Sequence, residues 1–204
     1  MIIENGVGNA NKGLVDGNNQ LHGLSISVTD IQDAVIKGNA YNINTGLVGL
    51  TAATESAVLY FKNDESPVNG ESGIVIDAIA IGIDDEGTTT GMTAITIIRN
   101  PTTGTIIDGT SAVDMNQNRN FGSSNALAST SLAYKGAEGN TFTNGADIAL
   151  FLQQPGTRAY YSIDMELERG SSIGIKMDTD TSGGTTNVYV ALILHRVDGK
   201  NFSA

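Results

Sequence analysis

A serine between glycines could act as a nucleophile in this chain. The segment Gly170-Ser171-Ser172-Ile173-Gly174 is followed by Asp178, Asp180 and then His195. This order of serine, acid and histidine matches hydrolases with a G-x-S-x-G motif. That motif requires a sharp turn from a strand into a helix, whereas the residues after Ser172 predict a strand. We therefore interpret the segment as a turn of small residues and predict that the protein is not an enzyme.

The two aspartates just named also begin a pattern typical of calcium loops, Asp178-Thr179-Asp180-Thr181-Ser182-Gly183. The twelfth position of such a loop needs a bidentate glutamate, and here it is Tyr189. Asp178 and Asp180 are therefore candidate metal ligands, but we expect a polar hairpin loop and neither a metal nor a cofactor.

Three carboxylates alternate along one predicted strand face, at Asp164, Glu166 and Glu168. A pair of acids is the usual requirement for cleaving a glycosidic bond, but such a row is more often a solvated face. Binding of a carbohydrate without cleavage would use exposed aromatic rings. Tryptophan is absent, so Tyr160 and Phe121 are the candidates.

The elements that position these residues are three predicted strands near the C-terminus. Residues 157–168 alternate strictly between apolar and polar, residues 172–178 do the same, and residues 186–197 are apolar on both faces. A strand with two apolar faces must be covered on both sides. We predict a hairpin between the first two strands, turned at Gly170, which would place Asp164 opposite Lys176 and Leu167 opposite Ile173.

The rest of the chain predicts further short strands and one helix. Thr29 is a helix N-cap and Gly38 a helix end. Residues 1–23 are polar and rich in Gly and Asn, which predicts an extended N-terminal arm before a domain over residues 24–204. The remaining predicted strands cover residues 24–28, 46–52, 56–62, 73–84, 91–99, 105–108, 130–135 and 147–153, with hairpins joining 46–52 to 56–62 and 91–99 to 105–108. The fold class is all-β: an antiparallel two-sheet sandwich of the jelly-roll type.

Composition excludes several function classes. The 204 residues carry a net charge of −11, which disfavours binding to nucleic acid or to a membrane surface. There is no cysteine, so disulfides and thiolate metal sites are excluded. The N-terminus lacks the pattern of a secretory signal, and we expect a protein made in the cytoplasm without Sec export.

Two stretches resemble virion structural proteins of tailed bacteriophages. The first is Gly38-Asn39-Ala40-Tyr41-Asn42-Ile43-Asn44-Thr45 with the following Gly46-Leu47-Val48-Gly49-Leu50-Thr51-Ala52-Ala53-Thr54-Glu55-Ser56-Ala57-Val58-Leu59-Tyr60-Phe61-Lys62-Asn63. The second is Gly170-Ser171-Ser172-Ile173-Gly174-Ile175-Lys176 with the apolar strand that ends at His195. The resemblance implies a non-enzymatic capsid decoration, or cement, protein on the virion surface. It implies binding to the lattice of the major capsid protein and assembly as a homotrimer.

Two alternatives remain beside capsid decoration. A tail, fibre or baseplate component would share the same resemblance. A carbohydrate-binding jelly-roll module would need Tyr160 or Phe121 as a platform for a sugar ring.

Overall fold

The computed structural model describes residues 2–4, 12–15, 21–22, 29–51, 54–65, 73–84, 91–107, 111–115, 117–179 and 185–197. The chain forms two compact units, Met1–Asp30 and Ile31–Ala204. The first unit contains a small antiparallel sheet of β1 (Ile2–Glu4), β2 (Lys12–Val15) and β3 (Leu21–His22). These strands fall where the sequence predicted an extended arm, and the boundary after residue 23 stays a prediction. The strand predicted over 24–28 lies outside the described residues.

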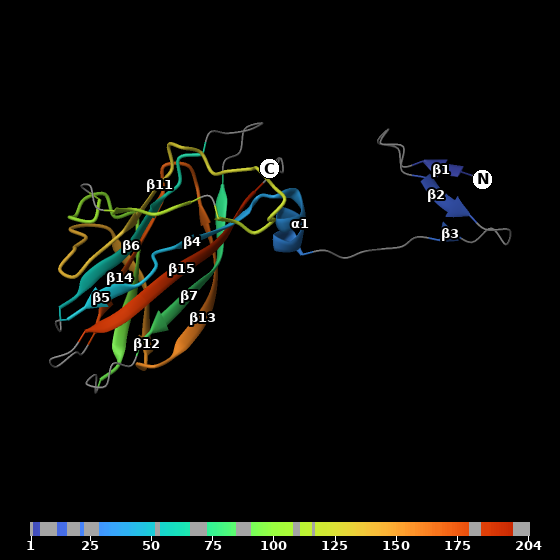
Figure 1. Cartoon of the computed structure of the whole chain (residues 1–204). Helices are drawn as coiled ribbons and strands as arrows, with labels where there is room; N and C mark the ends of the chain where they lie inside the picture. Colours follow the sequence, from blue (N-terminus) through green and yellow to red (C-terminus); the bar gives the residue numbers. More distant parts are fainter. Residues whose placement is uncertain are drawn as a thin grey trace. The chain divides into compact units, whose positions relative to one another are not determined.

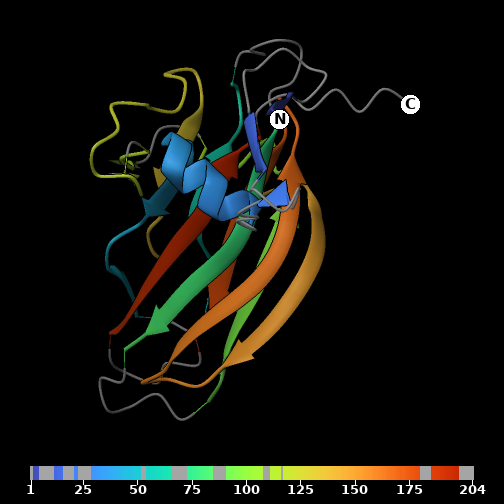
Figure 2. The same cartoon turned by 90° about the vertical axis from the view of Figure 1, so that its right-hand side faces the viewer.

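The second unit contains two antiparallel sheets of six strands each, seen as two layers in Figures 1 and 2. The first sheet has the order β10-β4-β15-β7-β13, with β5 also paired to β15. Its strands are β4 (Ala40–Asn44), β5 (Val48–Leu50), β7 (Ile74–Ile83), β10 (Gln117–Asn118), β13 (Arg158–Leu167) and β15 (Thr186–Arg196). The second has the order β12-β8-β14-β6-β11-β9. Its strands are β6 (Ser56–Lys62), β8 (Thr93–Arg99), β9 (Ser111–Ala112), β11 (Leu132–Lys135), β12 (Ala146–Gln153) and β14 (Ser172–Asp178).

The connectivity is that of a jelly roll. If the long strands β4, β6, β7, β8, β12, β13, β14 and β15 are numbered one to eight, the sheets have the orders 1-8-3-6 and 5-4-7-2. Each strand is therefore followed by one in the opposite sheet, except that β8 and β12 are neighbours. The predicted all-β two-sheet sandwich of jelly-roll type is confirmed.

The predicted hairpins are wrong. Strand β13 pairs with β7 in the first sheet, whereas β14 pairs with β6 and β8 in the second. The segments 46–52 and 56–62 are also in different sheets, and residues 105–107 form a turn while β8 pairs with β12. Alternation cannot distinguish these cases. Two strands with apolar faces can meet side by side in a hairpin or face to face across a core, and Leu167 and Ile173 both belong to the core.

Strand β15 is the centre of the first sheet and of the core. Its inward residues Val188, Val190, Leu192 and Leu194 have no exposed surface. The outward residues Tyr189, Ala191 and Ile193 are partly buried in the described structure. Coverage of the second face, which the sequence predicted, is therefore incomplete.

Helix α1 (Asp30–Lys37) begins and ends where the sequence predicted. Gly38 has φ +73°, a conformation suited to a helix end. The last carbonyls of the helix accept hydrogen bonds from asparagine side chains: Asn120 donates to Ile36, Asn125 to Lys37 and Asn118 to Gly38, at 2.7–3.1 Å. The segment 118–125 is thereby fixed to the helix.

Two loops cover part of the outer face of the second sheet. Phe142 and Ile106 pack with Tyr60 of β6 and Tyr134 of β11 in a small second core. The backbone of residue 143 donates to the carbonyl of residue 103, and the Asn144 side chain accepts from the backbone of residues 102 and 103. The loops 100–107 and 136–145 form one cover, which we call the loop cover.

Candidate functional site

The sandwich is bounded on one side by β12 of the second sheet and β13 of the first, each the last strand of its sheet. The two strands are consecutive in the chain and lie together at the right of Figure 2. Between them the rings of Phe151 and Tyr161 stack at 4.2 Å, and the Tyr161 hydroxyl donates to Gln153 Oε1 at 3.3 Å. Burial raises the pKa of Tyr161, so its hydroxyl stays protonated and able to donate. These contacts hold the two edge strands together at one end.

Apolar side chains are exposed along β12. Leu150 and Leu152, 65% and 58% exposed, lie on its outer face, and Ile148, 45% exposed, lies at a bulge in the pairing with β8, whereas Ala149 and Phe151 pack against the core. The free edge of β12 also has backbone groups that no described strand pairs with. Natural proteins usually protect such edges with charges or a cover, so an edge strand with three large exposed apolar side chains indicates a contact surface. We call Ile148, Leu150 and Leu152 the β12 row.

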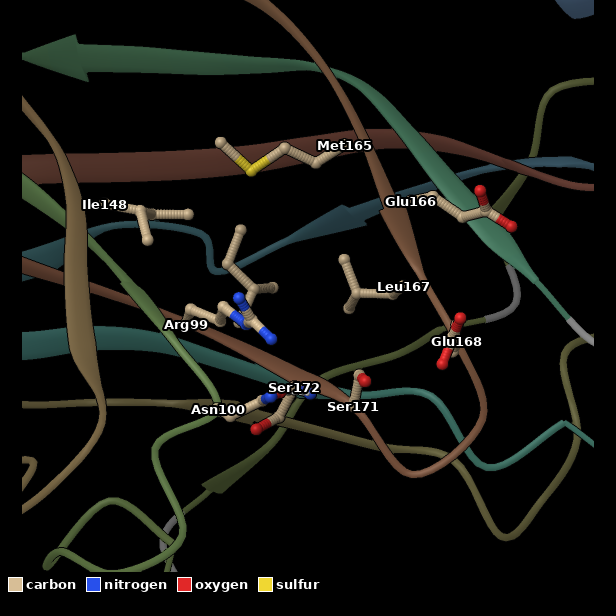
Figure 3. Close-up of a pocket in the computed structure, with 10 residues that line it drawn as sticks. Arg99, Asn100, Ile148, Met165, Glu166, Leu167, Glu168, Ser171 and Ser172 are labelled. Atoms are coloured by element: carbon tan, nitrogen blue, oxygen red, sulfur yellow. Dashed lines mark hydrogen bonds between the residues drawn. The ribbon is translucent and has the colours of Figure 1, made fainter.

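A cavity of about 550 Å³ opens beside the β12 row, between the two edge strands. Met165, Leu167 and Ile173 give it apolar walls. In Figure 3 Ile148 and Arg99 lie on one side, and Glu166 and Glu168 on the other. This arrangement suits an apolar side chain of a partner, with charged groups at the rim.

The structure does not assemble the candidate catalytic triad. Ser172 and His195 alternate with core residues, so they lie on the outer faces of opposite sheets. The Ser172 hydroxyl donates to the carbonyl of Pro101 at 3.2 Å. His195 Nδ1 lies 3.0 Å from Asp77 Oδ1 of β7, so its ring contacts a carboxylate of its own sheet. Ser172 is the first residue of strand β14, whereas the motif requires a helix directly after the serine.

The candidate metal ligands do not form a described site. Asp178 is exposed at the end of β14, and Asp180 lies outside the described residues. Within the part of the chain that the structure describes, no three acidic or histidine side chains cluster as a metal site would need. The predicted absence of a metal stays a prediction.

The row Asp164, Glu166 and Glu168 is exposed along and just after β13, as the solvated-face interpretation predicts. Asp164 has φ +43° at a bulge in the pairing of β13 with β7. Tyr160 is 63% exposed on the same strand, and Phe121 is fully exposed in the loop after β10.

Sequence reasoning missed the β12 row, although its signal is present. Residues 148–152 are Ile-Ala-Leu-Phe-Leu, an uninterrupted apolar run in a strand that the sequence predicted correctly. Such a run indicates two covered faces in a central strand. At the edge of a sheet it indicates one covered face and one available for contact, and only the structure shows that β12 is an edge.

Comparisons with known proteins add no identification. No family model matches the chain, and no curated protein matches it in sequence. Among the described residues no helix is long and apolar enough to cross a bilayer.

Proposed function

We propose that this protein is a non-enzymatic virion structural protein of a tailed bacteriophage, which decorates and stabilises the capsid by binding the assembled lattice of the major capsid protein. The sequence resemblance suggests the family. The observation that carries a role in assembly is the β12 row, because it combines exposed apolar side chains with a strand edge that no described strand pairs with.

The energetics of the β12 row favour repeated rather than single contacts. Complete burial of a Leu or Ile side chain contributes about 1.5–3 kcal/mol, and these three are already about half buried. One row is therefore a weak anchor after the entropy of association is subtracted. A homotrimer on a repeating lattice presents several such contacts at once, and their combined affinity exceeds that of any one of them.

In this proposal the β12 row and its neighbouring cavity form a contact between copies or with the shell. The compact N-terminal unit Met1–Asp30 serves as a further attachment to the shell. Packaged DNA inside the capsid would repel a protein with a net charge of −11. The charge therefore suits a position on the outside of the capsid.

The test is co-sedimentation of the purified protein with assembled heads and, separately, with tails of the phage that encodes it. We expect saturable binding to heads and none to dissociated major capsid protein. The Leu150→Ser variant should bind at least tenfold more weakly. The control is Leu47→Ser, since Leu47 is 64% exposed and Leu150 is 65% exposed.

Binding to tails instead of heads would favour the alternative of a tail, fibre or baseplate component. Binding to neither would contradict the proposal.

Light scattering of the full chain and of a chain beginning at Leu24 tests the trimer. A mass of three times 21.2 kDa for the full chain is expected. Its survival without residues 1–23 would assign self-association to the sandwich.

A further inference from the structure

A second hollow, of about 580 Å³, lies where β4 pairs with β10 and the chain continues into the loop 119–123. It belongs to the first sheet, whereas the β12 row belongs to the second. Its walls include Asn42 of β4, Gln117 of β10, and Arg119 and Phe121 of the loop. Among the described residues that line it, Arg119 alone is charged.

Two polar atoms in these walls lack partners. Asn42 Oδ1 and Arg119 Nη1 are buried, and neither has a hydrogen-bond partner in the described structure. A buried polar atom without a partner destabilises the fold, which is why most such atoms are satisfied. One is an acceptor and the other a charged donor, so together they favour a ligand with a hydroxyl and an anionic oxygen.

Hydrogen bonds and strand pairing fix the backbone at both residues. The Arg119 amide donates to the Ala40 carbonyl at 2.9 Å, and Asn42 is aligned with Gln117 on one side and Ile193 on the other. Neighbouring amides are committed elsewhere, since Asn118 and Asn120 donate to the end of α1. The hollow is thus built on a sheet and a helix end, so the cost of ordering it on binding is small.

An aromatic ring completes the hollow. The Phe121 side chain is fully exposed, which is unusual for a ring that could otherwise bury apolar area. A flat apolar ring next to hydrogen-bonding groups suits a ligand with one apolar face and a polar rim, such as a pyranose.

We propose that this hollow binds an acidic sugar. The carboxylate accepts from the Arg119 guanidinium, a ring hydroxyl donates to Asn42 Oδ1, and one face of the pyranose stacks on Phe121. We choose a sugar with a carboxylate because Arg119 is the single charged residue among the described residues of the lining. The rest of the protein, with a net charge of −11, would repel an anion. The inference is independent of capsid decoration.

The experiment is a calorimetric or NMR titration of the full chain with D-glucuronic acid, D-glucose and acetate at neutral pH. We expect a dissociation constant on the order of 1 mM for glucuronate, as for other small ligands in open pockets. Glucose and acetate should each bind at least tenfold more weakly, because each lacks one part of the recognition. Equal binding of acetate and glucuronate would overturn the assignment to a sugar, and equal binding of glucose would overturn the role of the carboxylate.

Variants then test the site itself. Phe121→Ala should weaken glucuronate binding at least tenfold without affecting the fold, since the ring contacts little. Tyr160→Ala is the matched control, because Tyr160 is an exposed aromatic on β13 and outside the hollow, and its loss should leave binding unchanged. Arg119→Gln should abolish the preference for glucuronate over glucose. No saturable binding of glucuronate to the native chain, or binding unchanged in Phe121→Ala, would overturn the proposal even if Arg119→Gln fails to fold.

Discussion

The outer face of the second sheet has two contrasting halves. Over β14, β6 and β11 the loop cover reduces the exposure of Tyr60 to 4%. Over β12, no described segment covers Leu150, which is 65% exposed. Lys176 marks the boundary, with its ammonium 3.1 Å from Glu55 Oε1 and 3.5 Å from Asp147 Oδ2 of β12.

The difference shows how one sheet can serve both folding and contact. The covered half is closed by the chain itself, through backbone hydrogen bonds such as Ala57 N to the Asn140 carbonyl at 2.7 Å and Gly136 N to the Val58 carbonyl at 2.8 Å. The apolar side chains of the open half are only about half buried in the described fold. We infer that the covered half contributes to stability, whereas the open half contributes to association.

The largest expected effect is a break in the covered half at Gly136. A Cβ added there would lie 1.8 Å from the Ala57 carbonyl oxygen, so the loop would have to leave β6. We expect Gly136→Ala to lower the free energy of unfolding by about 3 kcal/mol, the upper part of the usual range for overpacking. Chemical denaturation measures the change.

Gly139→Ala is the control in the same loop. Gly139 has φ +74° but nothing within 4 Å of an added Cβ, so only backbone strain of about 1 kcal/mol applies. Equal losses in the two variants would contradict the close packing of the loop cover on β6.

A smaller loss is expected from Phe142→Ala. The Phe142 ring lies 6.3 Å from that of Tyr60 and over Gly174, where an added Cβ would come within 2.6 Å of the ring. Removing a partly buried ring should cost about 2 kcal/mol, less than for a fully buried phenylalanine. Binding of a hydrophobic dye should rise at the same time, since the second core is opened. A stability within experimental error of the native value would mean that the cover is not needed.

Sequence patterns predicted the positions of the strands but not which strands pair with each other. Strand existence and bounds were accessible, because alternation and turn residues are local: residues 172–178 form β14 as predicted, and Gly170, where the sequence predicted a turn, has φ +84°. Strand partners were not accessible. The predicted pair of Asp164 and Lys176 is replaced by contacts of Lys176 with Glu55 and Asp147, residues from two distant parts of the chain.

The candidate sites show the same limit. Phe121 was named from its residue type alone. Arg119 is close to it in the sequence, but Asn42 lies in a distant segment that only the pairing of β4 with β10 brings near. The serine and histidine of the hydrolase pattern are in the right order along the chain and on opposite outer faces of the fold. When consecutive strands alternate between two sheets, the order of serine, acid and histidine along the chain is therefore a poor indicator that the three side chains meet.

Alkaline titration gives a third, smaller test of the covered half. Burial raises the pKa of Tyr60, although a hydrogen bond with Ser172 partly opposes the shift. The folded state therefore favours the neutral phenol. Its contribution to stability is complete below the unfolded pKa of about 10 and is lost as pH rises through the higher folded pKa. The free energy of unfolding of Tyr60→Phe should fall less between pH 9 and 11 than that of the native chain, and identical profiles would contradict the burial of Tyr60.

The smallest effect on stability is expected in the open half, from Leu150→Ser. Because Leu150 is already largely in water, its replacement should change the free energy of unfolding by less than about 0.5 kcal/mol. Self-association of the same variant, measured by light scattering over a range of concentrations, should nevertheless weaken, since the β12 row loses its central side chain. A large loss of stability in the isolated chain would mean that Leu150 packs within the molecule. Unchanged stability and unchanged association together would remove the β12 row as a contact between copies, and head binding by Leu150→Ser would then decide whether the row faces the shell.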